Sequence, residues 1–123
     1  MKKILIGTHN SGKFKEISYL LPKKIKKFSP LKLKIKSPKE TGKTFSSNAQ
    51  LKAKYFSKFT NLPVISDDSG ICIKALGNKP GIYSARWAKR QGSFSNAMKF
   101  ILKKMKNKKD RSAIFVCSLS FKY

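Results

Sequence analysis

The chain is 123 residues long, which suits one folded domain, and 40% of its residues are hydrophobic, as in ordinary globular proteins. It carries 29 Lys and Arg against five Asp and Glu, a net charge of +24. No apolar run approaches the ~20 residues of a membrane span, and the start of the chain is too short in apolar residues for a secretory leader. We therefore expect a cytoplasmic protein without a membrane partner. Cys72 and Cys117 are too few for a disulfide framework.

The basic charge has two interpretations. Nucleic acid is the first partner to consider, because phosphates attract a strongly positive field. However, all the basic residues except Arg86, Arg90 and Arg111 are Lys, whereas proteins that read nucleic-acid bases rely on Arg. Aromatic stacking motifs at regular spacing are also lacking. We favour a bias of composition, and a basic nucleic-acid-binding module stays the alternative function.

The first half of the chain predicts two strands and two helices. Residues 4–6 form a short apolar run typical of a buried strand, and a helix follows over residues 13–21, ended by Pro22. After a basic connector over residues 23–27, apolar residues alternate with lysines over residues 31–36, which predicts a half-exposed strand. Residues 37–43 form a loop. Thr44 is a good N-cap for a helix that runs to about Phe59.

The second half continues the alternation of strands with helices. Residues 64–66 predict a buried strand that leads into Asp67 and Asp68, and residues 71–73 resume an extended segment. A loop is expected over residues 77–84, then a helix over residues 94–105. Residues 113–121 are almost continuously apolar, which is typical of an interior strand. The class is α/β, with a single domain over residues 1–123. The inner face of the helix expected over residues 94–105 consists of Phe94, Ala97, Met98, Ile101 and Met105.

A glycine-rich loop over residues 7–13 joins the first strand to the first helix. Such a loop directs backbone N–H groups at an anion, and the helix dipole adds attraction. Lys13 supplies a full positive charge. The sequence of this loop is close to a Walker A motif, but Phe14 occupies the position at which that motif has a Ser or Thr whose hydroxyl ligates magnesium. A plain strand–turn–helix joint is the alternative.

The adjacent carboxylates Asp67 and Asp68 suggest a cation site, because five acids are scarce in this chain and like charges repel. Mg²⁺ is usually held by one or two carboxylates together with substrate phosphates. Glu40, in its loop, could complete such a site. The alternative is an Asp-Asp turn in which the side chains cap backbone N–H groups.

The helix after Thr44 places a lysine in its apolar stripe, which consists of Phe45, Ala49, Phe56 and Phe59. Lys52 either snorkels along the stripe to water or reaches phosphate oxygens, with Asn48, in the cleft that contains Lys13. The parts together suit one chemistry. Lysines hold a polyphosphate, carboxylates hold Mg²⁺, and an Asp activates the attacking water.

Several short motifs occur in order and cover almost the whole chain. They are Thr8–Lys13 with Glu16, Glu40–Phe45, Asn48-Ala49, Lys52-Ala53, Asp67–Gly70 and Pro80–Arg86. In order and spacing these motifs resemble those of the inosine/xanthosine triphosphate pyrophosphatase family.

The resemblance implies that ITP, dITP or XTP is hydrolysed to the monophosphate and pyrophosphate by a Mg²⁺-dependent homodimer. It also implies an elongated central mixed sheet flanked by helices, with a substrate cleft. Asp68 would be the general base and would bind metal with Glu40, and Asp67 would support the site. The residues expected to bind the nucleoside triphosphate are Thr8, His9, Asn10, Ser11, Gly12, Lys13, Asn48, Lys52 and Ser69.

The chain also departs from this family. By the resemblance, members continue past residue 123 into a glycine-phenylalanine-glycine-tyrosine-aspartate segment and a serine-histidine-arginine segment that grip the purine. Neither segment is present. We therefore expect a family fold cut short at its C-terminal side. A third interpretation is an inactive fragment that acts only through a partner.

Overall fold

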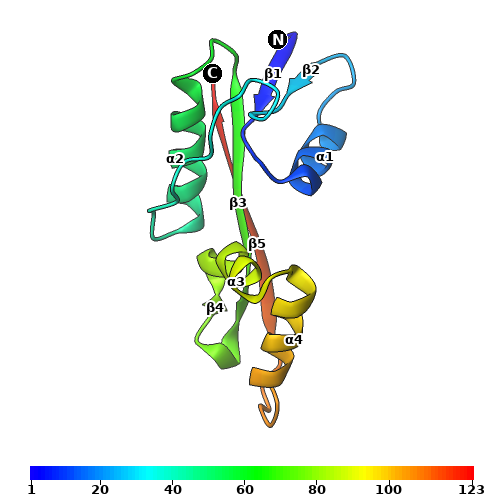
Figure 1. The fold of residues 1–123 in the computed structure, drawn as a ribbon, viewed down its shortest axis with the longest axis vertical. Coiled ribbons are helices and arrows are strands. Elements are labelled where there is room, and N and C mark those ends of the chain that lie inside the picture. The colour runs from blue at the N-terminus through cyan, green and yellow to red at the C-terminus, as the bar shows by residue number, and fades with distance from the viewer. The chain divides into compact units, whose positions relative to one another are not determined.

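The computed structural model describes all 123 residues, from Met1 to Tyr123 (Figure 1). Its five-stranded sheet has the order β2-β1-β3-β4, with β5 paired to β3. The sheet is mixed, because β1 is parallel to β2 and β3 while β3 is antiparallel to β4. The predicted α/β class is confirmed. The chain forms two compact units, residues 1–68 with 118–123 and residues 69–117.

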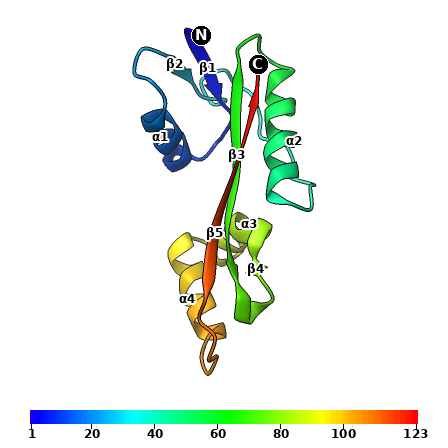
Figure 2. The same ribbon diagram turned by 180° about the vertical axis from the view of Figure 1, so that it is seen from behind.

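The first unit is built on β1 (Lys3–Ile6), α1 (Ser11–Leu20), β2 (Lys26–Phe28) and α2 (Phe45–Ser57), with the first half of β3 (Val64–Ile73). Figures 1 and 2 show α2 running alongside β3. Of its predicted apolar stripe, Ala49 and Phe56 are buried, and so is Ala53, whereas Phe59 lies beyond the end of the helix and is 57% exposed. The three buried residues are excluded from water together with β1, and that burial is the main source of stability in such a unit.

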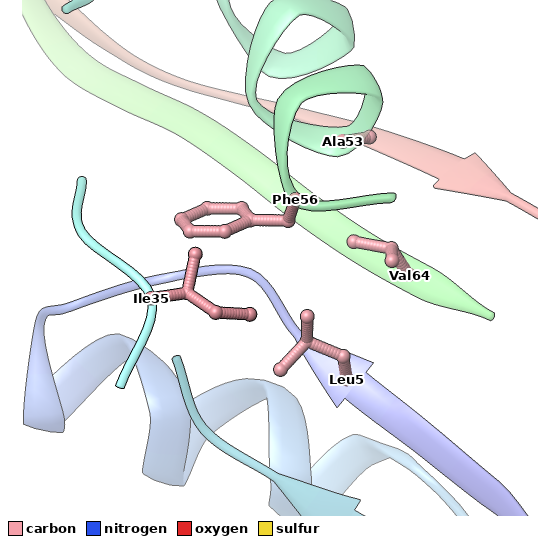
Figure 3. Packing of buried hydrophobic residues seen from close by; sticks show 5 residues of the cluster. All are labelled: Leu5, Ile35, Ala53, Phe56 and Val64. Carbon is pink, nitrogen blue, oxygen red and sulfur yellow. The ribbon is translucent and has the colours of Figure 1, made fainter. Parts of the chain in front are cut away.

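The core of the first unit is a small cluster drawn from four parts of the chain (Figure 3). The Phe56 ring is fully buried and faces Ile35, which comes from the segment before α2. The other members are Leu5 of β1, Ala53 of α2 and Val64 of β3. This cluster fixes the positions of β1, residue 35, α2 and β3, and the candidate site is built on segments that belong to or adjoin these four parts.

The second unit contains the rest of β3, two 3₁₀ turns (η1, Lys74–Leu76; η2, Gly81–Tyr83), β4 (Lys79–Pro80) and two helices. The helices are α3 (Ser84–Gln91) and α4 (Phe94–Lys104), which contact each other through the rings of Trp87 and Phe100, 5.8 Å apart. No helix in either unit is both long and apolar enough to span a membrane.

Two predictions about the region before α2 are wrong. The connector expected over residues 23–27 overlaps the edge strand β2, which covers residues 26–28. Residues 30–34 form a turn where a strand was expected over residues 31–36. The Ser29 hydroxyl accepts the Lys32 N–H, and the Ile35 N–H closes back onto the Pro30 carbonyl at 2.8 Å. Alternation with lysines was misleading here, since Leu31 is 66% exposed and only Ile35 is buried.

Predictions for the second half need three corrections. The expected loop over residues 77–84 contains β4 and η2, and its last residue, Ser84, begins helix α3. The helix over residues 94–105 is present as α4, but Phe94 and Met98 lie on its exposed side. The last strand is β5 (Ala113–Lys122), yet it is not interior. Its odd-numbered residues, Phe115, Cys117, Leu119 and Phe121, are exposed.

Candidate active site

The predicted phosphate loop lies between β1 and α1. Asn10 caps the helix, because its Oδ1 accepts the backbone N–H groups of Gly12 at 2.9 Å and Lys13 at 3.1 Å. Thr8 is buried and its hydroxyl accepts the Asn10 N–H at 3.1 Å. Ser11 and Gly12 are exposed. The loop is therefore preshaped and open to solvent at the positive end of a helix dipole, where an anion is favoured.

Gly7 is required by the close approach of this loop to its neighbours. A Cβ on Gly7 would overlap the Ser66 hydroxyl of β3 and would lie 2.7 Å from the Phe56 ring. Both neighbours are fully buried and have no room to move. The loop can leave β1 at this point only because residue 7 has no side chain.

Lys13 and Lys52 converge on Asp67 from two helices. The Lys13 Nζ lies 3.8 Å from Oδ2 of Asp67 and 3.7 Å from Oε2 of Glu16. The Lys52 Nζ donates to the Asp67 carbonyl oxygen at 2.8 Å and lies 3.3 Å from Oε1 of Glu40. The Lys52 side chain is only 13% exposed, so it does not snorkel to water. The two lysines predicted to hold phosphates thus belong to one charge network.

The two adjacent aspartates lie inside β3, whereas the strand was expected to end at Ser66. The alternative of an Asp-Asp turn is therefore wrong. Successive side chains of a strand point to opposite faces. Accordingly, Asp67 meets Lys13, while the neighbours of the Asp68 carboxyl include Asn48. Four of the chain's five acids, Glu16, Glu40, Asp67 and Asp68, gather in this network.

The Asp68 carboxyl is buried, and its pKa is raised. It is 6% exposed, and its Oδ2 has no hydrogen-bond partner. Burial and then the negative charge of Glu40 raise the pKa of Asp68 from its usual 3.8 to about 6, against the opposing effects of Asn48 and Lys52. A carboxylate with a pKa nearer neutrality accepts a proton more readily than an ordinary aspartate.

The residues present fit a magnesium ion. Glu40 and Asp68 are close enough for the charge of one to raise the pKa of the other, and a cation between them would offset that repulsion. No three of the chain's His, Cys, Asp and Glu side chains converge tightly enough to hold a metal unaided. Mg²⁺ does not need such a set, because waters and substrate phosphates supply its remaining ligands.

Two predicted substrate ligands have partners inside the protein. The His9 ring bonds to the Ile35 carbonyl oxygen at 2.8 Å, and the Asn48 side chain bonds to the backbone of Gly42. Sequence reasoning missed both partners. Gly42 had a signal, since a glycine shortly before an N-cap often marks a close backbone approach. Ser69 follows Asp68 on β3 and is half-buried. Its role stays a prediction.

Two surface hollows of about 360 and 350 Å³ lie elsewhere in the first unit. One is formed by the segment before α2 and the outer face of that helix, and the other by α2 and the end of β5. Neither is lined by a predicted site residue. Neither hollow therefore corresponds to the predicted substrate cleft, which stays a prediction.

Comparison with known proteins places the chain in a family. A model of the Ham1 family matches residues 4–123. A dITP/XTP pyrophosphatase from Gluconobacter oxydans is 40% identical over 118 residues, 95% of this chain and 57% of the relative. One from Leptospira interrogans is 38% identical over 98% of this chain and 62% of the relative. The chain thus spans about three-fifths of the length of these relatives.

Solved structures agree with the sequence comparisons. A HAM1 protein from Coxiella burnetii superimposes with a TM-score of 0.85 at 34% identity, covering 98% of this chain and 63% of that one. The Ham1 protein of Staphylococcus aureus gives a TM-score of 0.82 at 37% identity, with the same coverage. Because the family model matches nearly the whole chain and the solved structures share its fold, the chain belongs to the Ham1 family.

Proposed function

We propose that the protein hydrolyses non-standard purine nucleoside triphosphates, dITP, ITP and XTP, to the monophosphate and pyrophosphate, with Mg²⁺ as cofactor. Such an activity cleanses the nucleotide pool. One observation carries the proposal: Lys13, Lys52, Glu40 and Asp67 form a single charge network, next to the buried carboxyl of Asp68. The names of the relatives, dITP/XTP pyrophosphatases, support it.

The phosphate end of the substrate would lie on the loop of residues 8–13. The exposed N-terminus of α1 attracts the anion. When phosphate binds, Lys13 and Lys52 exchange their contacts with carboxylates for contacts with phosphate oxygens. Both lysines are bound to groups of this network, at 2.8 to 3.8 Å, so their ammonium groups are already placed. Ser69 would contact the substrate, and Asp67 would hold the lysines.

The reaction is the attack of water on the α-phosphorus. A new bond forms between the water oxygen and this phosphorus, the bond to the bridging oxygen breaks, and pyrophosphate leaves. Asp68 accepts the proton that the water loses. Positioning and neutralisation of charge supply most of the catalysis in such transfers. Glu40 and Asp68 would hold Mg²⁺, which when bound neutralises the phosphate oxygens.

The partners follow from the same proposal. The substrate is a small nucleoside triphosphate, and the protein is a cytoplasmic homodimer that binds nucleic acid only through its net charge. The segments that the resemblance assigns to purine recognition are not among these 123 residues.

The test separates binding from turnover. Mg²⁺-dependent release of pyrophosphate from dITP, ITP and XTP is measured for the chain and for Asp68→Asn, together with calorimetric binding of ITP. We expect Asp68→Asn to abolish hydrolysis and to keep non-specific DNA binding. Lys13→Ala should weaken ITP binding about tenfold or more, as expected for the loss of a charged contact. Unchanged ITP affinity in Lys13→Ala would contradict the proposed phosphate loop.

A further inference from the structure

The loop that carries Glu40 is held by two side chains from outside it. This Glu40 loop, residues 35–44, contains no helix or strand. Upstream of Glu40, the His9 Nε2 lies 2.8 Å from the Ile35 carbonyl oxygen. Downstream, the Gly42 N–H donates to Asn48 Oδ1 at 2.7 Å, and Asn48 Nδ2 approaches the Gly42 carbonyl oxygen at 3.4 Å. Glu40 lies between the two contacts.

The His9 contact ties the phosphate loop to the Glu40 loop. A carbonyl oxygen only accepts, so Nε2 carries the hydrogen of this contact. Nδ1 is buried and has no partner. The ring centroid lies 5.9 Å from that of Phe56, and Ile35 packs on Phe56 in the core (Figure 3). The Nε2–H of the imidazole is therefore used inside the protein.

The Asn48 contact ties the Glu40 loop to α2. Asn48 is 2% exposed, and its amide uses both its oxygen and its nitrogen on Gly42. A Cβ on Gly42 would overlap the Ser47 hydroxyl and lie 2.6 Å from Asn48 Oδ1. Only glycine lets the backbone come this close. The same Asn48 side chain also acts on the Asp68 carboxyl as a hydrogen-bond donor.

We infer that His9 and Asn48 are positioning residues, which fix the Glu40 loop at both ends and so place the Glu40 carboxylate beside Lys52 and Asp68. In this arrangement His9 Nε2 and both polar atoms of the Asn48 amide are already bound to backbone atoms of the Glu40 loop. The inference rests on the proposed function for its catalytic meaning. Its structural part does not depend on turnover: His9, Gly42 and Asn48 hold the Glu40 and Asp68 carboxylates in place as a preorganised pair.

The test measures cation and phosphate binding separately. Mn²⁺ titrated calorimetrically without nucleotide reports on the Glu40–Asp68 pair, and inorganic tripolyphosphate without metal reports on the lysines. We expect His9→Phe and Gly42→Ala to weaken Mn²⁺ binding roughly 10- to 100-fold, the usual cost of losing support behind a metal ligand. Tripolyphosphate affinity should change less than threefold. Lys13→Ala is the matched control, with the opposite pattern.

A second variant and a second readout guard against a general loss of structure. His9→Gln puts an amide donor where Nε2 lies and should restore most of the Mn²⁺ affinity that His9→Phe loses. Amide hydrogen exchange should quicken at residues 36–44 in His9→Phe and stay unchanged in β1. Weakened tripolyphosphate binding with unchanged Mn²⁺ affinity would make His9 a phosphate ligand and overturn the inference. Failure of Lys13→Ala alone would count against the proposed function instead.

Discussion

At the scale of single residues, Asp68 makes stability depend on pH. Its pKa is raised to about 6 in the fold by burial and then by the charge of Glu40, whereas the unfolded carboxyl ionises near 3.8. Between these values the folded protein keeps a proton that the unfolded chain has lost. In the metal-free protein, stability therefore falls as pH rises from about 4 to 6 and is level above that.

Asp68→Asn should remove this slope and stabilise the metal-free protein at pH 7 by up to about 3 kcal/mol, the free energy of a two-unit shift. Urea unfolding at intervals from pH 3 to pH 8 measures it. Asp110 is the control, because hydrogen bonds from Ser112 lower the pKa of this exposed carboxyl. Loss of the Asp110 carboxyl should lower stability by a constant amount above about pH 4, and that difference should shrink as pH falls further, so the fall from pH 4 to 6 should stay unchanged. A wild-type profile without the fall from pH 4 to 6 would contradict the burial of a charged Asp68.

Gly7 is a second residue whose replacement has a defined consequence. Gly7→Ala should destabilise the protein by roughly 1–3 kcal/mol or more, since its Cβ would overlap the buried Ser66 hydroxyl and crowd Phe56. Thermal unfolding with far-UV circular dichroism measures the loss. Gly12→Ala is the matched control, because its Cβ would meet only the Asn10 side-chain oxygen at 3.2 Å. An equal loss of stability in both variants would show that the backbone conformation of the loop, and not the packing against Ser66 and Phe56, requires glycine at residue 7.

At the scale of elements, α2 is the helix that carries Asn48 and Lys52, and its start is well defined. The Thr44 hydroxyl accepts the Ser47 N–H at 3.0 Å, and the Ser47 hydroxyl accepts the Thr44 N–H at 3.1 Å. Thr44→Ala should cost about 1 kcal/mol in the free energy of unfolding. Ser46→Ala, on the exposed side of the same turn, should cost less than half as much. Urea titration of both variants checks this difference, and equal costs would mean that the cap contributes nothing.

Sequence patterns predicted elements well where a local signal agreed with burial. Strand β1, helix α1 and helix α2 have strong caps or apolar runs, and each was found within two residues of its expected position. The turn at residues 30–34 was missed because Leu31 and Leu33 look like strand residues, although only Ile35 finds a core contact. Strand β5 was expected to be interior, and nothing in a single strand's sequence shows what lies on its faces.

The charged cluster was predicted more fully in its membership than in its contacts, and the roles of its residues stay predictions. Lysine and carboxylate types at Lys13, Lys52, Glu40 and Asp68 were sufficient to indicate one polar cluster. The bonds of His9 and Asn48 to backbone atoms were not foreseen, because backbone partners distant in sequence leave no pattern in residue types. Such contacts require the fold.

At the scale of the whole molecule, the net charge of +24 opposes the compact state. Stability should therefore rise with salt, because screening shortens from about 30 Å at 0.01 M to about 10 Å at 0.1 M. We expect the urea midpoint to increase from 10 to 200 mM NaCl. Replacement of the exposed Lys23 and Lys24 by Gln should reduce the increase. A midpoint that is flat or falls with salt would mean that ion pairs, such as that of Lys52 with Glu40, outweigh the repulsion.

The exposed side of β5 also provides a built-in probe. Cys117 is exposed between Phe115, which is 83% exposed, and Leu119, which is 57% exposed, whereas Cys72 on β3 is only partly accessible. A maleimide dye should therefore label Cys117 first. Whatever molecule comes to lie over this strand will slow that labelling, with Cys72 as the internal reference, so the rate of thiol alkylation records in real time whether the strand is covered.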